Sequence, residues 1–192
     1  MNDVEKKSPG RPRSTASHQA ILRATLELLA EVGFEAMSIE AVAARGKVGK
    51  TTIYRRYRSK EELVADAIES VREEIAVPDT GHLWADIDAL IEDAARNTLT
   101  PLGRQTVAMI ISSAASNSGF AQIYWEKYLH PRRQSFDIVI ERAQTRNEVP
   151  KDLDPGLVFD TMSGIMLYAL IFPPPSESWS AYVRRALGLL LS

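Results

Sequence analysis

The chain has 192 residues, of which 45% are apolar and 25% are charged, and its formal net charge is −2. This composition is typical of a folded globular protein, and the length suits one large domain or two small ones. The chain contains no cysteine, which excludes disulfides, thiolate metal sites and a cysteine nucleophile. Its histidines, His18, His82 and His130, are far apart in the sequence, so we expect neither a histidine metal site nor a cofactor.

The longest uninterrupted apolar run, 165–172, has eight residues, whereas a membrane-spanning helix needs about 20. The first residues are polar and lack the apolar segment of a signal peptide. We therefore expect a soluble, cytoplasmic protein with no membrane partner.

Charge is distributed unevenly along the chain. Residues 1–60 carry 12 Lys and Arg against 6 Asp and Glu, a balance of +6, whereas the remainder carries 11 against 19, a balance of −8. A basic segment on an acidic body is expected where one small module contacts a polyanion and the rest of the protein does not. The alternative is a solvated surface without a partner.

The most basic stretch is the start of the chain, where 1–14 are expected to form a disordered arm. Within it, Gly10-Arg11-Pro12-Arg13 resembles the core of an AT-hook. Proline keeps such a backbone extended, and glycine lets it lie close in a narrow minor groove. Arg11 and Arg13 are therefore candidate DNA contacts, with a solvated cationic tail as the alternative.

Two longer helices are predicted in the first 77 residues. One runs from Thr15 to Gly33, because apolar side chains recur on one face and glycine commonly ends a helix. Its stripe consists of Ile21, Thr25, Leu28, Leu29 and Val32. The other starts at Ser59, which forms a capping box with Glu62, and continues through 61–77 as a connecting helix. Its stripe consists of Leu63, Val64, Ala67, Ile68, Val71 and Ile75.

Two shorter helices lie between them: 38–45, with Ser38 as its N-cap, and 49–56, joined by a turn at 46–48. Two short helices with a three-residue turn and a preceding helix are the elements of a helix-turn-helix. Residues 15–60 are therefore predicted to form a domain whose third helix enters the major groove of double-stranded DNA. Its candidate contacts are Lys50, Thr51, Thr52, Tyr54 and Arg55.

Simpler interpretations of this segment remain open. Thr51 and Thr52 could be ordinary helix surface, and Tyr54 could be a half-buried core residue. The run from Gly46 to Thr52 also suggests a phosphate-binding loop, but a Walker loop requires glycine five residues before its Gly-Lys pair, and position 44 is alanine. With no paired catalytic motif elsewhere, we expect no enzymatic activity.

Side chains that mark the second, third and fourth helices occur at a distinctive spacing: Ser38, Val42, Ala43, Val48, Lys50, Thr52, Ile53, Tyr54, Tyr57, Ser59, Lys60, Glu61 and Leu63. In these positions the chain resembles the DNA-binding domain of the tetracycline-repressor (TetR) family. The resemblance implies that Thr51 and Thr52 read bases in the major groove. It also implies that Tyr54 and Lys60 hold phosphates and that the protein is a homodimer.

Three positions depart from the family pattern. Gly46 replaces the usual alanine, Lys47 the usual turn glycine and Gly49 the usual capping serine. The turn glycine is therefore expected one position earlier than in the family, at the point that sets the angle between the two helices. Gly49 remains an acceptable N-cap.

The rest of the chain is predicted to be helical, with no pattern that demands a strand. The expected helices are 81–98, 101–115, 118–146, 155–171 and 177–191, the third with a bend near Pro131. The fold class is therefore all-α with about nine helices. The resemblance implies that 78–192 form a helical ligand-binding and dimerisation domain.

Aromatic and methionine side chains in this part predict a ligand pocket, because methionine adapts to irregular shapes; plain core packing is the alternative. The candidate pocket residues are Trp84, Met109, Trp125, Phe159, Met162 and Met166. Few charged residues are forced inward, so an apolar or aromatic small molecule is the expected effector. Arg96 or Arg104 could pair with a carboxylate on it.

Each of the last two predicted helices has an apolar face that is too wide to be buried without a partner helix. Two copies packed about a two-fold axis would bury both faces and present two recognition helices to successive major grooves. The candidate interface residues are Ile165, Ala169, Val183 and Leu187. The alternative is an intramolecular core.

These patterns together predict a dimeric transcriptional regulator, a repressor released from a near-palindromic operator by a small-molecule effector. The alternative is a DNA-binding protein of the same fold that has no small-molecule effector and is controlled by a protein partner.

Overall fold

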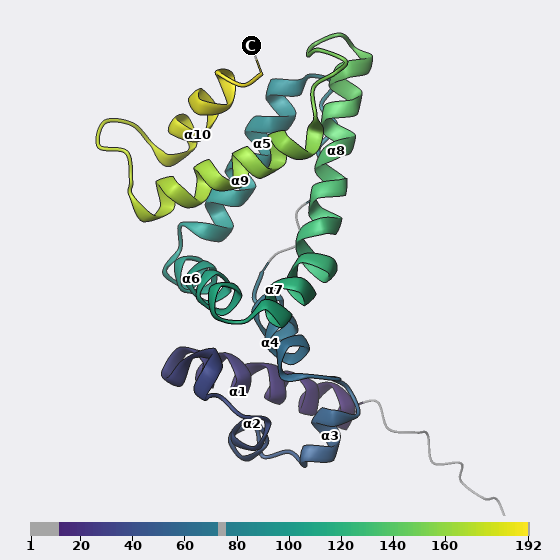
Figure 1. Ribbon diagram of the computed structural model, residues 1–192, viewed down its shortest axis with the longest axis vertical. Coiled ribbons are helices and arrows are strands. Elements are labelled where there is room, and N and C mark those ends of the chain that lie inside the picture. Colours follow the sequence, from purple (N-terminus) through teal and green to yellow (C-terminus); the bar gives the residue numbers. More distant parts are fainter. Residues whose placement is uncertain (1–11, 73–75, 192) are drawn as a thin grey trace, which may run out of the picture.

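The computed structural model describes residues 12–72 and 76–191, with side chains from residue 15 onward. Its elements are α1 (Pro12–Ala36), α2 (Ile39–Arg45), α3 (Lys50–Tyr54), α4 (Lys60–Glu69), α5 (Leu83–Thr98), α6 (Pro101–Ser116), α7 (Ser118–Tyr124), the π-helix η1 (Trp125–Leu129), α8 (His130–Thr145), α9 (Pro155–Ile171) and α10 (Trp179–Gly188). Within these ranges the protein is built from helices alone (Figure 1), which confirms the predicted all-α fold. The helices α7, η1 and α8 follow one another without a loop. Counted as one continuous helix, they bring the number of helices in the described part to nine.

The first helix begins earlier than predicted. It starts at Pro12, three residues before Thr15, and proline is well tolerated in the first turn of a helix because its missing N–H has no partner there. Gly33 interrupts α1 with φ 76°, as its role as a helix stop predicts. Val32 is 49% exposed, so its assignment to the buried stripe is wrong.

Serine caps set the starts of α2 and α4, as predicted. The Ser38 hydroxyl accepts a hydrogen bond from the Ala41 N–H at 3.1 Å, and the Ser59 hydroxyl accepts one from the Glu62 N–H at 3.2 Å. The Glu62 carboxylate accepts the N–H of Arg58 at 2.9 Å, one residue before the cap. The reciprocal half of the capping box is therefore shifted by one position.

The fourth helix is shorter than predicted. It ends at Glu69, and Val71 beyond it is 36% exposed, so the predicted continuous connecting helix over 61–77 is wrong. Ile75 lies outside the described residues.

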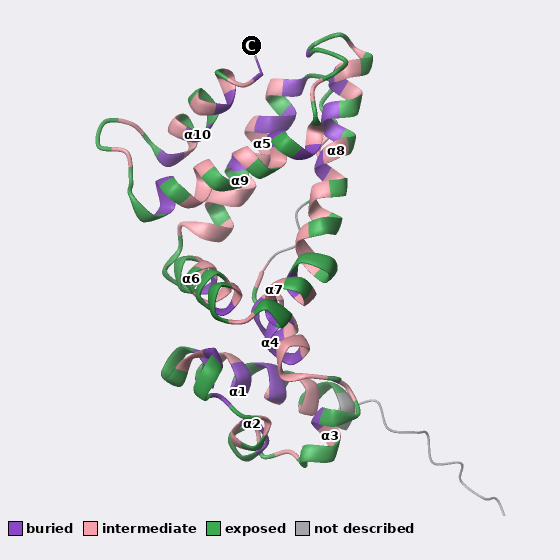
Figure 2. Ribbon diagram, viewed as in Figure 1, coloured by how far each residue is buried: buried purple, intermediate pink, exposed green. Residues whose placement is uncertain are grey.

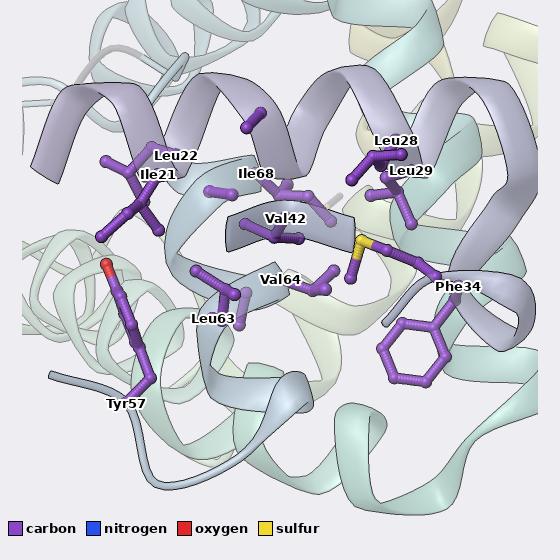
Figure 3. Close-up of a cluster of buried hydrophobic side chains, with 14 of the residues drawn as sticks. Ile21, Leu22, Leu28, Leu29, Phe34, Val42, Tyr57, Leu63, Val64 and Ile68 are labelled. Atoms are coloured by element: carbon purple, nitrogen blue, oxygen red, sulfur yellow. The ribbon is translucent and has the colours of Figure 1, made fainter. Parts of the chain in front are cut away.

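The helices α1 to α4 pack around one apolar cluster, in which side chains from α1, α2 and α4 point toward one another (Figure 3). Ile21, Val42, Leu63 and Ile68 have no exposed surface. Truncating a side chain of this kind to alanine costs about 2–5 kcal/mol. This cluster fixes α2 and α3 at the end of the molecule farthest from α10 (Figure 1).

A second apolar cluster joins α5, α8, α9 and α10 at the opposite end. Buried residues gather between these helices and again where α1 meets α4 (Figure 2). The helices α6 and α7 connect the two parts, since α6 packs on α1 and α7 packs on α4. None of the described helices has the length and apolar character required to cross a bilayer.

The irregularity predicted near Pro131 is present as the π-helix η1. There the His130 N–H donates to the carbonyl of Trp125, five residues earlier. Proline at the next position has no N–H to donate, so the wider turn occurs where the α-helical pattern would lose a bond in any case.

Candidate nucleic-acid interface

The recognition helix α3 is fixed by its buried face. Ile53 has no exposed surface, and Tyr57, just beyond the helix, is 4% exposed. Burial raises the pKa of the Tyr57 phenol to about 12, so its hydroxyl stays protonated within reach of His18 Nδ1, 3.4 Å away. With these two side chains inward, the opposite face of α3 points to solvent (Figure 2).

The predicted DNA contacts on α3 lie on that outer face. Lys50, Thr51, Tyr54 and Arg55 are exposed, and Thr52 is half-buried. Tyr54 is 57% exposed, which excludes the alternative of a core tyrosine in this structure. The structure therefore brings five candidate residues to one surface.

The charge of Lys50 is partly balanced on that surface. Its ammonium lies 3.1 Å from the Glu40 carboxylate of α2, and both side chains are 55% exposed. A backbone hydrogen bond together with Lys50 lowers the pKa of Glu40. Exposed ion pairs contribute little to stability and are screened by salt, so a phosphate can replace Glu40 as the partner of Lys50.

The turn before α3 keeps its left-handed residue at position 47. Lys47 has φ 51°, whereas Gly46 is right-handed with φ −75°. The glycine is therefore not a displaced turn residue, which corrects that expectation. A Cβ at Gly46 would lie 3.2 Å from the Val42 carbonyl and 3.3 Å from that of Ala20, so its small size serves the close approach of α1 and α2.

Lys60 has partners that the sequence did not suggest. Its ammonium donates to the backbone carbonyls of Phe34, Glu35 and Met37 at 2.9, 3.4 and 3.2 Å. These carbonyls lie where α1 ends and lack helical partners. The cation also lies 4.5 Å from the centre of the Phe34 ring. In this structure Lys60 joins the end of α1 to the start of α4.

The arginines of the AT-hook-like segment are only partly covered by the structure. Arg11 lies outside the described residues. The backbone of Pro12 and Arg13 belongs to α1, whereas the Arg13 side chain lies outside the described part. The expected arm therefore cannot extend to residue 14, and an extended backbone at Pro12 is wrong.

The end of α4 is held by side chains of α7 and α8. The Glu69 carboxylate, 9% exposed, accepts a hydrogen bond from Tyr124 and pairs with both guanidinium nitrogens of Arg132. Burial, with Glu69 beside it, raises the pKa of Tyr124. Arg72 approaches the same carboxylate, with its Nε 3.6 Å from Oε1.

One turn earlier on α4, Asp66 is held by η1. Its carboxylate accepts hydrogen bonds from Tyr128 and from Lys127, the latter at 2.6 Å. Burial and this bond raise the pKa of Tyr128. We call Asp66, Glu69, Tyr124, Tyr128, Lys127 and Arg132 the junction network. It binds the helix that starts beside α3 to the C-terminal part of the protein, and its contacts span 55 to 63 residues of sequence.

The predicted pocket residues do not meet in one place. Trp84, Phe159, Met162 and Met166 belong to the C-terminal cluster. Met109 packs on the N-terminal cluster, and Trp125 is 40% exposed beside His130. Of the two predicted carboxylate partners, Arg104 donates to the Leu170 carbonyl at 2.8 Å and Arg96 pairs with Asp93.

Two hollows occur elsewhere in the described part. A groove of about 440 Å³ between the start of α4 and η1 is lined by Arg58, Ser59, Glu62, Ile123, Glu126 and Lys127. A cavity of about 190 Å³ is lined by Val71, Arg72, Arg96, Asn97, Thr100, Leu102, Gly103 and Thr106. Neither contains a predicted pocket residue, although the cavity includes Arg96.

Most of the predicted dimer contacts are internal. Ala169 is 1% exposed, and Val183 and Leu187 have no exposed surface within a single chain. Ile165 is half-buried against the same cluster. The assignment of Ala169, Val183 and Leu187 to the interface is therefore wrong, because α5 and α9 already cover the apolar face of α10. The assignment of Ile165 stays a prediction.

Two protein-family models match the chain. Residues 21–67 match "Bacterial regulatory proteins, tetR family", and residues 77–190 match "Tetracyclin repressor-like, C-terminal domain". The first range contains the helix-turn-helix, and the second contains the C-terminal helices.

Individual relatives agree with these matches. The HTH-type transcriptional regulator YdeS of Bacillus subtilis is 31% identical over 91% of this chain and 88% of its own length. The DNA-binding transcriptional repressor TetR of Mycobacteroides abscessus is 27% identical, covering 93% and 94%. The crystal structure of TetR family transcription regulator SCO0332 superposes with a TM-score of 0.66 at 27% identity, covering 91% and 96%. The chain therefore belongs to the tetracycline-repressor family of DNA-binding transcriptional regulators.

Proposed function

We propose that this protein is a dimeric repressor that a small molecule releases from a near-palindromic operator in the cytoplasm. The observation that carries the proposal is the outward face of α3, whose exposed hydroxyl and basic side chains lie opposite a fully buried Ile53. The repressor role is also supported by the relative from Mycobacteroides abscessus, which is named a repressor.

In this proposal Thr51 and Thr52 read base edges, whereas Lys50, Tyr54 and Arg55 bind phosphates. The short α3 and its C-cap residue Arg55 place all of these side chains within one and a half turns. Lys60 has a structural role because its ammonium already serves three carbonyls of α1.

The dimer is proposed to form through the outer face of α9. Leu157, Tyr168 and Ile171 are 57%, 57% and 58% exposed, and their spacing places them on one side of the helix. Gly164 lies on the same side, with no atom within 4 Å of where its Cβ would be. A glycine in an apolar stripe lets a second helix approach closely. A two-fold axis here would use the same stripe from both copies.

DNA selection from a random pool, followed by a reporter fused to the selected site, tests this function. We expect a near-palindromic site with half-site centres about 34–36 Å apart, or a multiple of that distance, and reduced transcription in the presence of the protein. Increased transcription would overturn the repressor role. Selection of a single half-site would overturn the dimer.

Sedimentation of Tyr168→Glu tests the interface. Two glutamates brought together at a two-fold axis would repel each other in an apolar setting, so we expect a folded monomer. Arg185→Met, an exposed substitution on α10, is the control and should remain dimeric. A dimeric Tyr168→Glu would move the interface elsewhere.

A further inference from the structure

The cavity of about 190 Å³ lies where the chain leaves α4 and where α5 turns into α6. Sites for drug-sized ligands usually measure about 300–1,000 Å³, so this cavity suits a smaller molecule. Its shape depends on Gly103, where a Cβ would lie 2.0 Å from the Asn97 carbonyl oxygen. Any larger residue there would force the first turn of α6 away from the end of α5.

Among the described residues that line this cavity, the charged side chains are both cations. Arg72 and Arg96 supply two guanidinium groups, and no Asp or Glu is among these described lining residues. Arg96 is 66% exposed and pairs with Asp93 three residues away, a type of surface pair that is easily exchanged. An anion in the cavity could therefore replace Asp93 as the partner of Arg96 at little cost.

Arg72 is the less well satisfied of the two. The carboxylate beside it, Glu69, is already engaged by Arg132 through both oxygens and by Tyr124. Two guanidinium groups thus share one negative charge. The Arg72 Nε is buried, lies 3.6 Å from Glu69 and has no hydrogen-bond partner among the described residues. A buried donor of this kind is costly unless another acceptor is supplied.

The remaining lining is partly apolar. Val71 and Leu102 contribute aliphatic surface, whereas Asn97, Thr100 and Thr106 contribute amide and hydroxyl groups. A carboxylate can accept hydrogen bonds from a guanidinium through two oxygens, and a short hydrocarbon tail could cover the aliphatic side.

We propose that this cavity binds a small carboxylate, held by Arg72 and Arg96, and that this carboxylate is the effector. The proposal rests on the proposed function for its regulatory meaning. Binding would draw Arg72 away from Glu69, the last residue of α4, and so change the charge balance of the junction network. For release from DNA, the carboxylate must bind the DNA-incompetent arrangement more tightly than the competent one.

Thermal unfolding of the full-length protein tests the site. The probes are sodium acetate, benzoate and hexanoate, each compared with its amide and with sodium chloride at equal ionic strength. A ligand that binds only the folded state raises its stability. We expect at least one carboxylate at saturating concentration to raise the Tm by about 3 °C or more over both comparisons. Arg72→Met should abolish that difference, and Arg72→Lys should retain part of it.

Arg96→Met, at an exposed position, provides a variant that does not threaten folding and should reduce the carboxylate shift. Arg185→Met, which loses an exposed pair with Glu177, should leave it unchanged. The proposal is overturned if no carboxylate exceeds sodium chloride, or if both Arg72→Met and Arg96→Met respond like wild type. Failure of the proposed function would be seen separately, because wild-type protein would then select no DNA.

Discussion

The ammonium of Lys60 lies over the ring of Phe34, 4.5 Å from its centre, and donates a 2.9 Å hydrogen bond to the Phe34 carbonyl. One side chain at the start of α4 thus satisfies the end of α1. In the family resemblance this lysine holds a phosphate, whereas here its three donors already have three backbone acceptors.

Lys60→Met should lower the free energy of unfolding by about 1–3 kcal/mol, because three carbonyls lose their charged donor while the aliphatic stem is kept. Urea denaturation measures this loss. The salt dependence of DNA binding should be unchanged per bound dimer. Unchanged stability together with a shallower salt slope would instead assign Lys60 to phosphate.

Thr51→Ala should relax sequence preference at one or two base pairs of each half-site, since its hydroxyl is proposed to contact a base edge. Tyr54→Phe should weaken binding on every sequence by about 0.5–1.5 kcal/mol, because a phosphate contact carries no sequence information. Competition binding on the selected operator and its point variants distinguishes the two. Both residues are exposed, so neither change should alter the Tm. A Tyr54→Phe variant with altered base preference would contradict the assignment.

Lys47→Gly should raise the free energy of unfolding by about 0.5–1 kcal/mol. Lys47 has φ 51°, a conformation that costs a non-glycine residue about 1–2 kcal/mol. Glycine removes this cost, but its greater freedom in the unfolded chain offsets part of the gain in stability. Chemical denaturation tests the prediction, with Lys50→Gly as the matched control. That variant should be destabilised because it places glycine in the first turn of α3 and removes the pair with Glu40. A less stable Lys47→Gly would show that the lysine side chain stabilises the turn.

Glu69→Gln should destabilise the protein by about 3 kcal/mol or more, because Arg132 and Tyr124 would keep their partial burial without the carboxylate. Thermal unfolding measures the loss. Glu31→Gln, which affects an exposed pair between Glu31 of α1 and Arg45 of α2, is the control for simple charge removal and should have a small effect. If the two variants lost equal stability, the junction network would contribute no more than a surface pair.

Asp137→Asn should stabilise the protein near neutral pH. Burial raises the pKa of the Asp137 carboxyl, and its Oδ1 has no hydrogen-bond partner among the described residues. A raised pKa in the folded state means that the stability contributed by the protonated group is present at low pH and is lost as the pH rises through that pKa. The gain of the variant should therefore disappear below about pH 3.9, where the unfolded carboxyl is also protonated. Urea midpoints at pH 3 and pH 7 test this; an equal gain at both would contradict the titration argument.

Local signals allowed much of the N-terminal domain to be predicted from the sequence. Ser38 and Ser59 cap helices, and Gly33 interrupts one, through contacts within a few residues. The outward face of α3 was also predictable, since Ile53 and Tyr57 leave only one side free for polar contacts.

Contacts between distant segments were not predictable in this way. The partners of Lys60 are 23 to 26 residues away, and Tyr124 and Arg132, which hold Glu69, are 55 and 63 residues away from it. The helix α9 carries apolar residues on both sides, so the sequence alone could not show that Ala169 faces inward and Tyr168 outward. Only the position of α10 settles which side remains available to a second copy.

The π-helix η1 also sets the rotational register between α7 and α8. A π turn contains about one residue more than an α turn, so the same residues wound as a regular α-helix would rotate α8 by about 100° relative to α7. Tyr124 of α7 would keep its position against α4, but Arg132 would turn away from the Glu69 carboxylate that both now share. The one extra residue held in η1 is therefore what lets both helices grip the end of α4 at the same time.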